Sequence, residues 1–119
     1  MAESYENLKV WQESVELASD IYILTKSFPK EELFGLTSQL RRAVVSVSAN
    51  IAEGAGRNAK GDYRRFLDIA TGSLHETEST LAVASRLGYI SPEQFLEIKK
   101  RTSTIGKMLG GLRKYINNK

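Results

Sequence analysis

The amino-acid sequence predicts an all-α protein, an antiparallel up-down-up-down four-helix bundle in which residues 1–119 form a single domain. Three observations predict this fold. Apolar residues recur with a helical period in four segments, and no segment shows a convincing strand period. The connections between the segments are short, so consecutive helices must run antiparallel. A helix of about 20 residues is ~30 Å long, so the four helices can match in length.

The first predicted helix covers residues 6–27. Its apolar residues form two adjacent arcs that together cover about half of the helix circumference, which is wider than the stripe that one core requires. We therefore predict that part of the second arc contacts another subunit. Pro29 ends the helix region, because proline disfavours the α conformation of the preceding residue, Phe28. The residues predicted at the subunit contact are Leu17, Ile21 and Leu24.

The second predicted helix covers residues 36–54, and Gly54 is placed to end it in a left-handed conformation. One face of this helix is apolar, as a core face must be. The opposite face carries small and weakly apolar residues, whereas a solvated face normally carries charged ones. We therefore predict that the backbone of another subunit approaches this face, and that the protein is a homo-oligomer. The residues of the predicted interface on this helix are Val45, Ala49 and Ala52.

The third predicted helix covers residues 59–87, with Asn58 as its N-cap and Gly88 as the residue that stops it. The fourth helix has the clearest start signal, the sequence SPEQ at residues 91–94. This sequence supplies an N-cap serine, a proline at the first helical position and the glutamine of a capping box.

Catalytic and metal-binding patterns are missing from the sequence. It contains no cysteine and a single histidine, His75, and Gly72 occupies the position where a Glu-x-x-His motif of a metal-binding bundle needs a glutamate. Residues 54–59 match the fingerprint G-x-G-x-x-A, but they follow a predicted helix and not the strand that a dinucleotide fold requires. We therefore predict a protein that is not an enzyme, with no catalytic residues, metal, cofactor or small-molecule substrate.

Charge is distributed unevenly along the chain, although the net charge is only +3. Residues 1–35 carry a net charge of −4, residues 36–65 carry +4, residues 66–98 carry −4 and residues 99–119 carry +7. Two interpretations stay open. In the first, opposite charges of neighbouring helices pair across the helix contacts. In the second, a basic stripe binds an anionic partner.

Six basic residues form the candidate nucleic-acid-binding site. Four of them lie at the turn before the third helix or in its first turns, and two lie near the start of the second helix, so they need not form one patch within a subunit. Guanidinium groups beside free helix N–H groups bind phosphate well. The alternative is that these cations pair with Glu53, Asp62, Asp68 or another subunit. Residues 99–119 are a second candidate contact surface. The six residues are Arg41, Arg42, Arg57, Lys60, Arg64 and Arg65.

Four stretches of the sequence resemble the four-helix bundle family that is also called the 23S rRNA intervening-sequence protein family. They are LTSQLRRA (36–43), NIAEG (50–54), FLDIATGSLHETE (66–78) and LGYI (87–90). The resemblance implies a bacterial, cytoplasmic four-helix bundle that assembles into a barrel-shaped homopentamer. It also implies a relation to the accessory protein of diversity-generating retroelements, a basic pentamer that works with nucleic acid. The family has no established enzymatic activity.

Two functions therefore stay open: a homo-oligomer that binds nucleic acid, with RNA as the expected ligand, and a protein-interaction or scaffolding oligomer. No contact with a membrane is expected, because the sequence has no run of 18 apolar residues. The first residues lack the apolar core of a signal peptide, so we expect a cytoplasmic protein.

Overall fold

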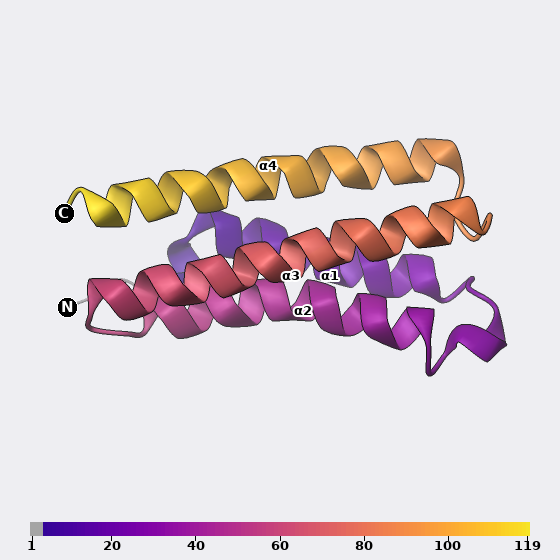
Figure 1. The fold of residues 1–119 in the computed structure, drawn as a ribbon, viewed down its shortest axis with the longest axis horizontal. Coiled ribbons are helices and arrows are strands. Elements are labelled where there is room, and N and C mark those ends of the chain that lie inside the picture. The colour runs from indigo at the N-terminus through magenta and orange to yellow at the C-terminus, as the bar shows by residue number, and fades with distance from the viewer. Residues whose placement is uncertain (1–3) are drawn as a thin grey trace.

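The computed structural model describes residues 4–119, which form four α-helices and two short 3-10 turns with no strand (Figure 1). The helices lie side by side along the 46 Å long axis, each antiparallel to the next, and the predicted fold class is confirmed. The elements are η1 (Tyr5–Asn7), α1 (Lys9–Thr25), η2 (Lys30–Glu32), α2 (Leu36–Ala55), α3 (Lys60–Arg86) and α4 (Pro92–Asn117).

A single apolar core runs between the four helices. Each helix contributes the face on which apolar residues recur every three or four positions, so the core follows from the sequence pattern. The largest fully buried side chains include Leu17, Ile21, Leu40, Ile51, Leu67, Leu74, Leu81, Ile105 and Leu109.

The predicted subunit contact is wrong for Leu17 and Ile21 of α1. Their exposed fractions are 1% and 0%, so both side chains belong to the core of their own subunit. Leu24 is half-buried and packs against the same core. The wide apolar surface of α1 has a simpler cause, because this helix packs against α2 on one side and against α4 on the other. A helix with two neighbours needs a broader apolar arc than a helix that covers one.

α2 and α3 form the most extensive helix pair, and small residues allow their close approach. A Cβ atom at Gly54 would lie 2.9 Å from the Cβ of Phe66 and 3.1 Å from the Cδ1 of Tyr63. Further along the pair, the Ser73 hydroxyl donates to the Ser46 hydroxyl at 2.9 Å. Gly54 therefore provides space for α3.

The prediction that Gly54 ends α2 in a left-handed conformation is wrong. α2 continues to Ala55, and Gly88 is the one glycine of residues 4–119 with a positive φ. Gly88 ends α3 as predicted, with a φ of +80° and a hydrogen bond from the Tyr89 N–H to the Ala84 carbonyl. The predicted capping box at the start of α4 is also confirmed.

The α1–α2 and α3–α4 connections lie at the same end of the bundle and contact each other. The Tyr89 hydroxyl donates to Glu32 Oε2 at 2.9 Å, and this hydrogen bond raises the pKa of Tyr89. The Tyr89 ring packs on Phe28, with ring centroids 5.4 Å apart. The α2–α3 turn, the start of α1 and the end of α4 lie at the opposite end (Figure 1).

Candidate nucleic-acid interface

Arg41 and Arg42 of α2 have different environments. The Nε of Arg41 donates to the Thr25 hydroxyl at 2.9 Å, and its guanidinium group lies 4.6 Å from the ring centroid of Tyr22. These contacts hold the guanidinium group of Arg41 against α1, and its part in nucleic-acid binding stays a prediction. Arg42 is exposed on the outward face of α2.

Arg57 and Arg65 lie on the ring of Phe66 beside the α2–α3 turn. Their guanidinium carbons lie 4.9 Å and 4.6 Å from the ring centroid. Arg57 also pairs with Glu53 at 3.2 Å, one helical turn earlier. Cation–π contacts at exposed sites stabilise by about 0.5–1 kcal/mol, so they orient both guanidinium groups without removing them from solvent.

Lys60 is the first residue of α3, and Arg64 lies one turn later. The predicted N-cap, Asn58, is wrong, because Ala59 occupies that position and no side chain accepts a hydrogen bond from the first N–H groups of the helix. The first turn of α3 therefore carries both backbone N–H groups without a side-chain cap and the ammonium group of Lys60. Such a helix start favours anions over cations.

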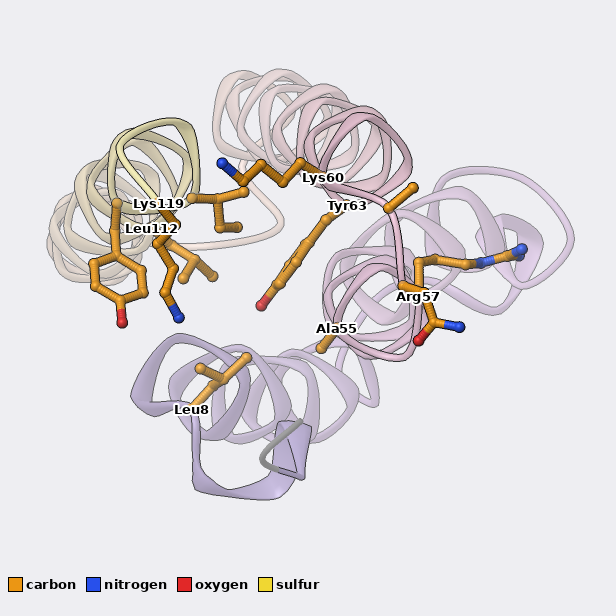
Figure 2. A pocket seen from close by; sticks show the side chains of 11 residues that line it. Leu8, Ala55, Arg57, Lys60, Tyr63, Leu112 and Lys119 are labelled. Atoms are coloured by element: carbon orange, nitrogen blue, oxygen red, sulfur yellow. The ribbon is translucent and has the colours of Figure 1, made fainter. Parts of the chain in front are cut away.

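A hollow of about 520 Å³ opens at this end of the bundle (Figure 2). The side chain of Tyr63 projects between the helices towards its centre, and Lys60 and Lys119 line it together with the end of α4. Partial burial raises the pKa of Tyr63. Arg57 points away from the hollow, although its backbone is part of the lining turn. The apolar walls are formed by Leu8, Ala55, Leu112 and Ile116.

Three lysines form a row on the outward face of α4 that is absent from the predicted site. Lys100, Lys107 and Lys114 are seven residues apart, which places them on one face at intervals of ~10.5 Å. All three are exposed, and none forms an ion pair with another residue of the described range. The seven-residue spacing within the basic segment 99–119 is the signal that identifies them.

The arginines of α4 behave differently from its lysines. Arg101 pairs with Asp20 of α1 at 2.7 Å, and Arg113 forms two hydrogen bonds with the carboxylate of Asp68, of 2.7 and 3.1 Å. The hydrogen bond from Arg113 lowers the pKa of Asp68. Charge complementarity between helices therefore accounts for these two arginines, whereas the lysines of the row keep their charge available at the surface.

The start of α3 lies beside the last turns of α4, the helix that carries the lysine row. The Arg113–Asp68 pair joins the two helices beside Lys114, and the positive charge of Arg64 also contributes to the lowered pKa of Asp68. Two of the six predicted residues, Lys60 and Arg64, therefore lie at the end of α3 that is near the end of α4. We group these two cations with the lysine row and call the set the basic edge, and its residues are Lys60, Arg64, Lys100, Lys107 and Lys114.

The other predicted residues do not join the basic edge. Arg57 and Arg65 lie around Phe66. Arg42 precedes Arg57 by fifteen residues of helix and turn, which corresponds to ~22 Å along the axis. The sequence analysis left open that oligomerisation brings Arg42 close to Arg57 and Arg65 of another subunit. This stays a prediction.

The predicted interface strip of α2 lies at the surface of the subunit. Val45 and Ala49 are exposed and Ala52 is half-buried, so all three can contact a neighbour. Gly72 of α3 also faces open space, since a Cβ atom at this residue would have no other atom within 4 Å. The role of this strip in an oligomer stays a prediction.

These features define a class of protein: a small antiparallel helical bundle with short connections and a basic outer edge. Within residues 4–119 no group of three His, Asp or Glu side chains is arranged to hold a metal ion, and none of the helices is long and apolar enough to cross a membrane.

The chain belongs to the 23S rRNA-intervening sequence protein family, because the model of that family matches residues 6–111. A similar solved structure is the crystal structure of a protein with unknown function from the S23 ribosomal protein family of Bacteroides thetaiotaomicron. The two chains share 32% sequence identity with a TM-score of 0.82, over 88% of this chain and 95% of that one. No curated protein matches the chain. The resemblance inferred from the sequence is confirmed.

Proposed function

We propose that the protein is a non-enzymatic homo-oligomer, a pentamer as the family resemblance implies, that binds RNA or another nucleic acid through its basic edge. The observation that carries this proposal is the row of Lys100, Lys107 and Lys114, which are exposed and form no ion pair with a described residue. Phosphate contacts supply most of the affinity for a nucleic acid and need no sequence information. Cytoplasmic location is part of the same proposal.

The dimensions of the basic edge suit a nucleic-acid backbone. The row from Lys100 to Lys114 is ~21 Å long, which corresponds to about six steps of 3.4 Å along one strand of a duplex. Lys60 and Arg64 extend the surface at one end of the bundle. Lysine ammonium groups act as mobile point charges, so we expect binding with strong salt dependence and low sequence specificity.

The test is a measurement of RNA binding by fluorescence anisotropy over a range of salt concentrations. The triple variant Lys100→Gln, Lys107→Gln, Lys114→Gln should lower the slope of log K against log [salt] by about 2 to 3, because each phosphate contact contributes about 0.7 to 0.9. The ligand in this experiment is a labelled RNA hairpin.

The matched control is the triple variant Lys9→Gln, Lys26→Gln, Lys30→Gln. It removes the same charge from three exposed lysines of α1 and the α1–α2 connection. The control should change the slope by much less than the α4 variant. Equal slopes for the two variants, or no binding by the unaltered protein at low salt, would contradict the proposal.

A second candidate function is a protein-interaction or scaffolding oligomer without a nucleic-acid role. The near-complete exposure of Phe34 favours it, because a phenylalanine at the surface contributes to protein contacts and not to phosphate binding. Co-purification of a protein that survives nuclease digestion would support this second function. Loss of the co-purifying protein on digestion would support the first.

A further inference from the structure

Phe34 is the most exposed large apolar side chain of residues 4–119, with an exposed fraction of 94%. It follows Leu33, which is 49% exposed, in the α1–α2 connection. Single exposed apolar residues are common on protein surfaces, but two adjacent large ones, one of them almost free of contacts, form a protrusion. We call Leu33 and Phe34 the apolar knob.

The connection that carries the apolar knob is held in place by Glu32. One carboxylate oxygen accepts a hydrogen bond from the Leu36 N–H at 3.2 Å, and the other accepts from the Tyr89 hydroxyl at 2.9 Å. The Gly35 N–H donates to the Glu32 carbonyl at 3.0 Å. A Cβ at Gly35 would lie 3.1 Å from the carboxylate, so glycine leaves room for it. The knob is therefore presented from an ordered turn.

A hollow of about 560 Å³ lies at the same end of the bundle, on the outer side of α3 and the start of α4. Val83 and Leu87 line it and are about half-exposed, and Phe95 of α4 lines it as well. The remaining lining residues are small or polar, apart from Arg86. We call this the α3–α4 hollow.

We propose that the apolar knob of one subunit inserts into the α3–α4 hollow of a second copy of the chain. This inference rests on the homo-oligomer of the proposed function and specifies the contact that builds it. The knob and the hollow are both apolar, and Phe34 makes almost no contact within its own subunit. Charge supports the same pairing, because the exposed Glu31 precedes the knob and the exposed Arg86 lines the hollow.

The positions of the two surfaces determine the kind of assembly. The α1–α2 and α3–α4 connections lie at the same end of the bundle (Figure 1). The knob belongs to the α1–α2 connection and the hollow is lined by α3 and α4, so the contact joins two different surfaces and is heterologous. Heterologous contacts form rings when the rotation between subunits closes. Because both surfaces lie at the same end of the bundle, neighbouring subunits stay at about the same height, and the contact favours a ring of parallel bundles over a filament.

The test is cross-linking between single-cysteine variants, which is unambiguous because the chain contains no cysteine. Glu31→Cys and Arg86→Cys place thiols beside the knob and the hollow. They remove one exposed charge pair, which contributes little to affinity, and leave both apolar surfaces intact. A short bis-maleimide is the reagent, since a disulfide would require Cα atoms within about 7 Å. We expect cross-linked dimers from a mixture of the two variants and none from either variant alone. The double variant should give a ladder that ends at the number of subunits in the ring.

Phe34→Ser in the double-cysteine chain is the discriminating variant. It should weaken association about 10- to 100-fold per contact and abolish the ladder, while circular dichroism shows an intact fold because the residue is at the surface. The matched control is Tyr115→Ser, which removes an exposed aromatic side chain from the opposite end and should leave the ladder unchanged.

The remaining outcomes separate this contact from the proposed function. An oligomer that persists in Phe34→Ser, or that gives no cross-link between residues 31 and 86, overturns the knob-and-hollow contact and leaves the oligomer standing. Cross-linking of Glu31→Cys chains to one another indicates a twofold contact and also overturns it. If the unaltered protein is a monomer in light scattering, both the contact and the proposed oligomer are wrong.

Discussion

The two ends of the bundle have opposite surface chemistry. At the end with the α1–α2 and α3–α4 connections, the exposed side chains include large apolar ones, and Phe34 is the extreme case. At the other end, residues 107–119 carry four cations and no carboxylate side chain, and Lys60 lies beside them at the start of α3. Exposed apolar area favours contact with protein, and unpaired cations favour contact with polyanions. Under the proposed function, the apolar side chains supply the contact between subunits and the cations bind RNA.

The largest expected effect is a loss of stability when the packing of α2 against α3 is disrupted at the basic end. In Gly54→Val the added side chain would meet Phe66, whose Cβ lies only 2.9 Å from the position of a new Cβ, so α2 and α3 must separate. Overpacking of this kind costs about 3 kcal/mol of unfolding free energy. Chemical denaturation measures it, and RNA binding should fall as well, because α3 carries Lys60 and Arg64.

The matched control for this substitution is Gly72→Val, on the outer side of the same helix pair. Nothing lies within 4 Å of a Cβ at Gly72, so the unfolding free energy of a monomer should change by less than about 0.5 kcal/mol. A large loss in Gly72→Val, or a small one in Gly54→Val, contradicts the assignment of close helix packing to Gly54.

The fold could be predicted from the sequence because its signals are local. The apolar period of each helix reports its core face, and the residues of the capping box, Ser91 and Gln94, lie within one helical turn. The predictions for Gly54 and Leu17 were wrong for a common reason. Both depend on how helices pack, since Gly54 makes room for α3 and Leu17 faces a core that four helices share.

The candidate site was harder to predict, because contacts between residues distant in the sequence determine which cations are paired and which stay unpaired. Arg41 donates to Thr25, sixteen positions earlier, and Arg101 pairs with Asp20, eighty-one positions earlier. Periodicity says nothing about which cations find such partners. It does identify Lys100, Lys107 and Lys114 as one face, but their availability follows only from the structure. The exposure of Phe34 is equally non-local, because helical period does not extend into a connection.

The second prediction compares the two ends by their response to salt. The contribution of the three lysines of the row to the RNA-binding constant should fall about 20- to 40-fold between about 50 and 200 mM salt, because counterion release reduces the binding constant as a power of the salt concentration. Self-association through the apolar knob should stay constant, or strengthen in sulfate, which favours apolar burial. Anisotropy and sedimentation of the same samples measure both. If self-association weakened in parallel with RNA binding, the contact between subunits would be ionic and the comparison would fail.

The smallest expected effect concerns Asp68, which neutralises one cation next to the basic edge. Arg113 lowers the pKa of Asp68, so the pair stabilises the fold above the unfolded-state pKa of about 3.9, and this contribution is lost as the pH falls through the lower folded-state pKa. Both side chains are more than a third exposed, so solvent screens the pair and its contribution to stability is small. Asp68→Asn should therefore be slightly less stable at neutral pH and equal to the unaltered protein in strong acid, as measured by urea unfolding.

The same substitution should strengthen RNA binding while it weakens the fold. Asp68→Asn leaves Arg113 without its carboxylate partner beside Lys114, so one more cation joins the basic edge. The slope of log K against log [salt] should then rise by up to about 1, because one additional phosphate can be contacted. Asp20→Asn is the matched control, since it frees Arg101 on the side of α4 that faces α1. An equal gain in both variants would mean that RNA responds to net charge and not to the position of the basic edge.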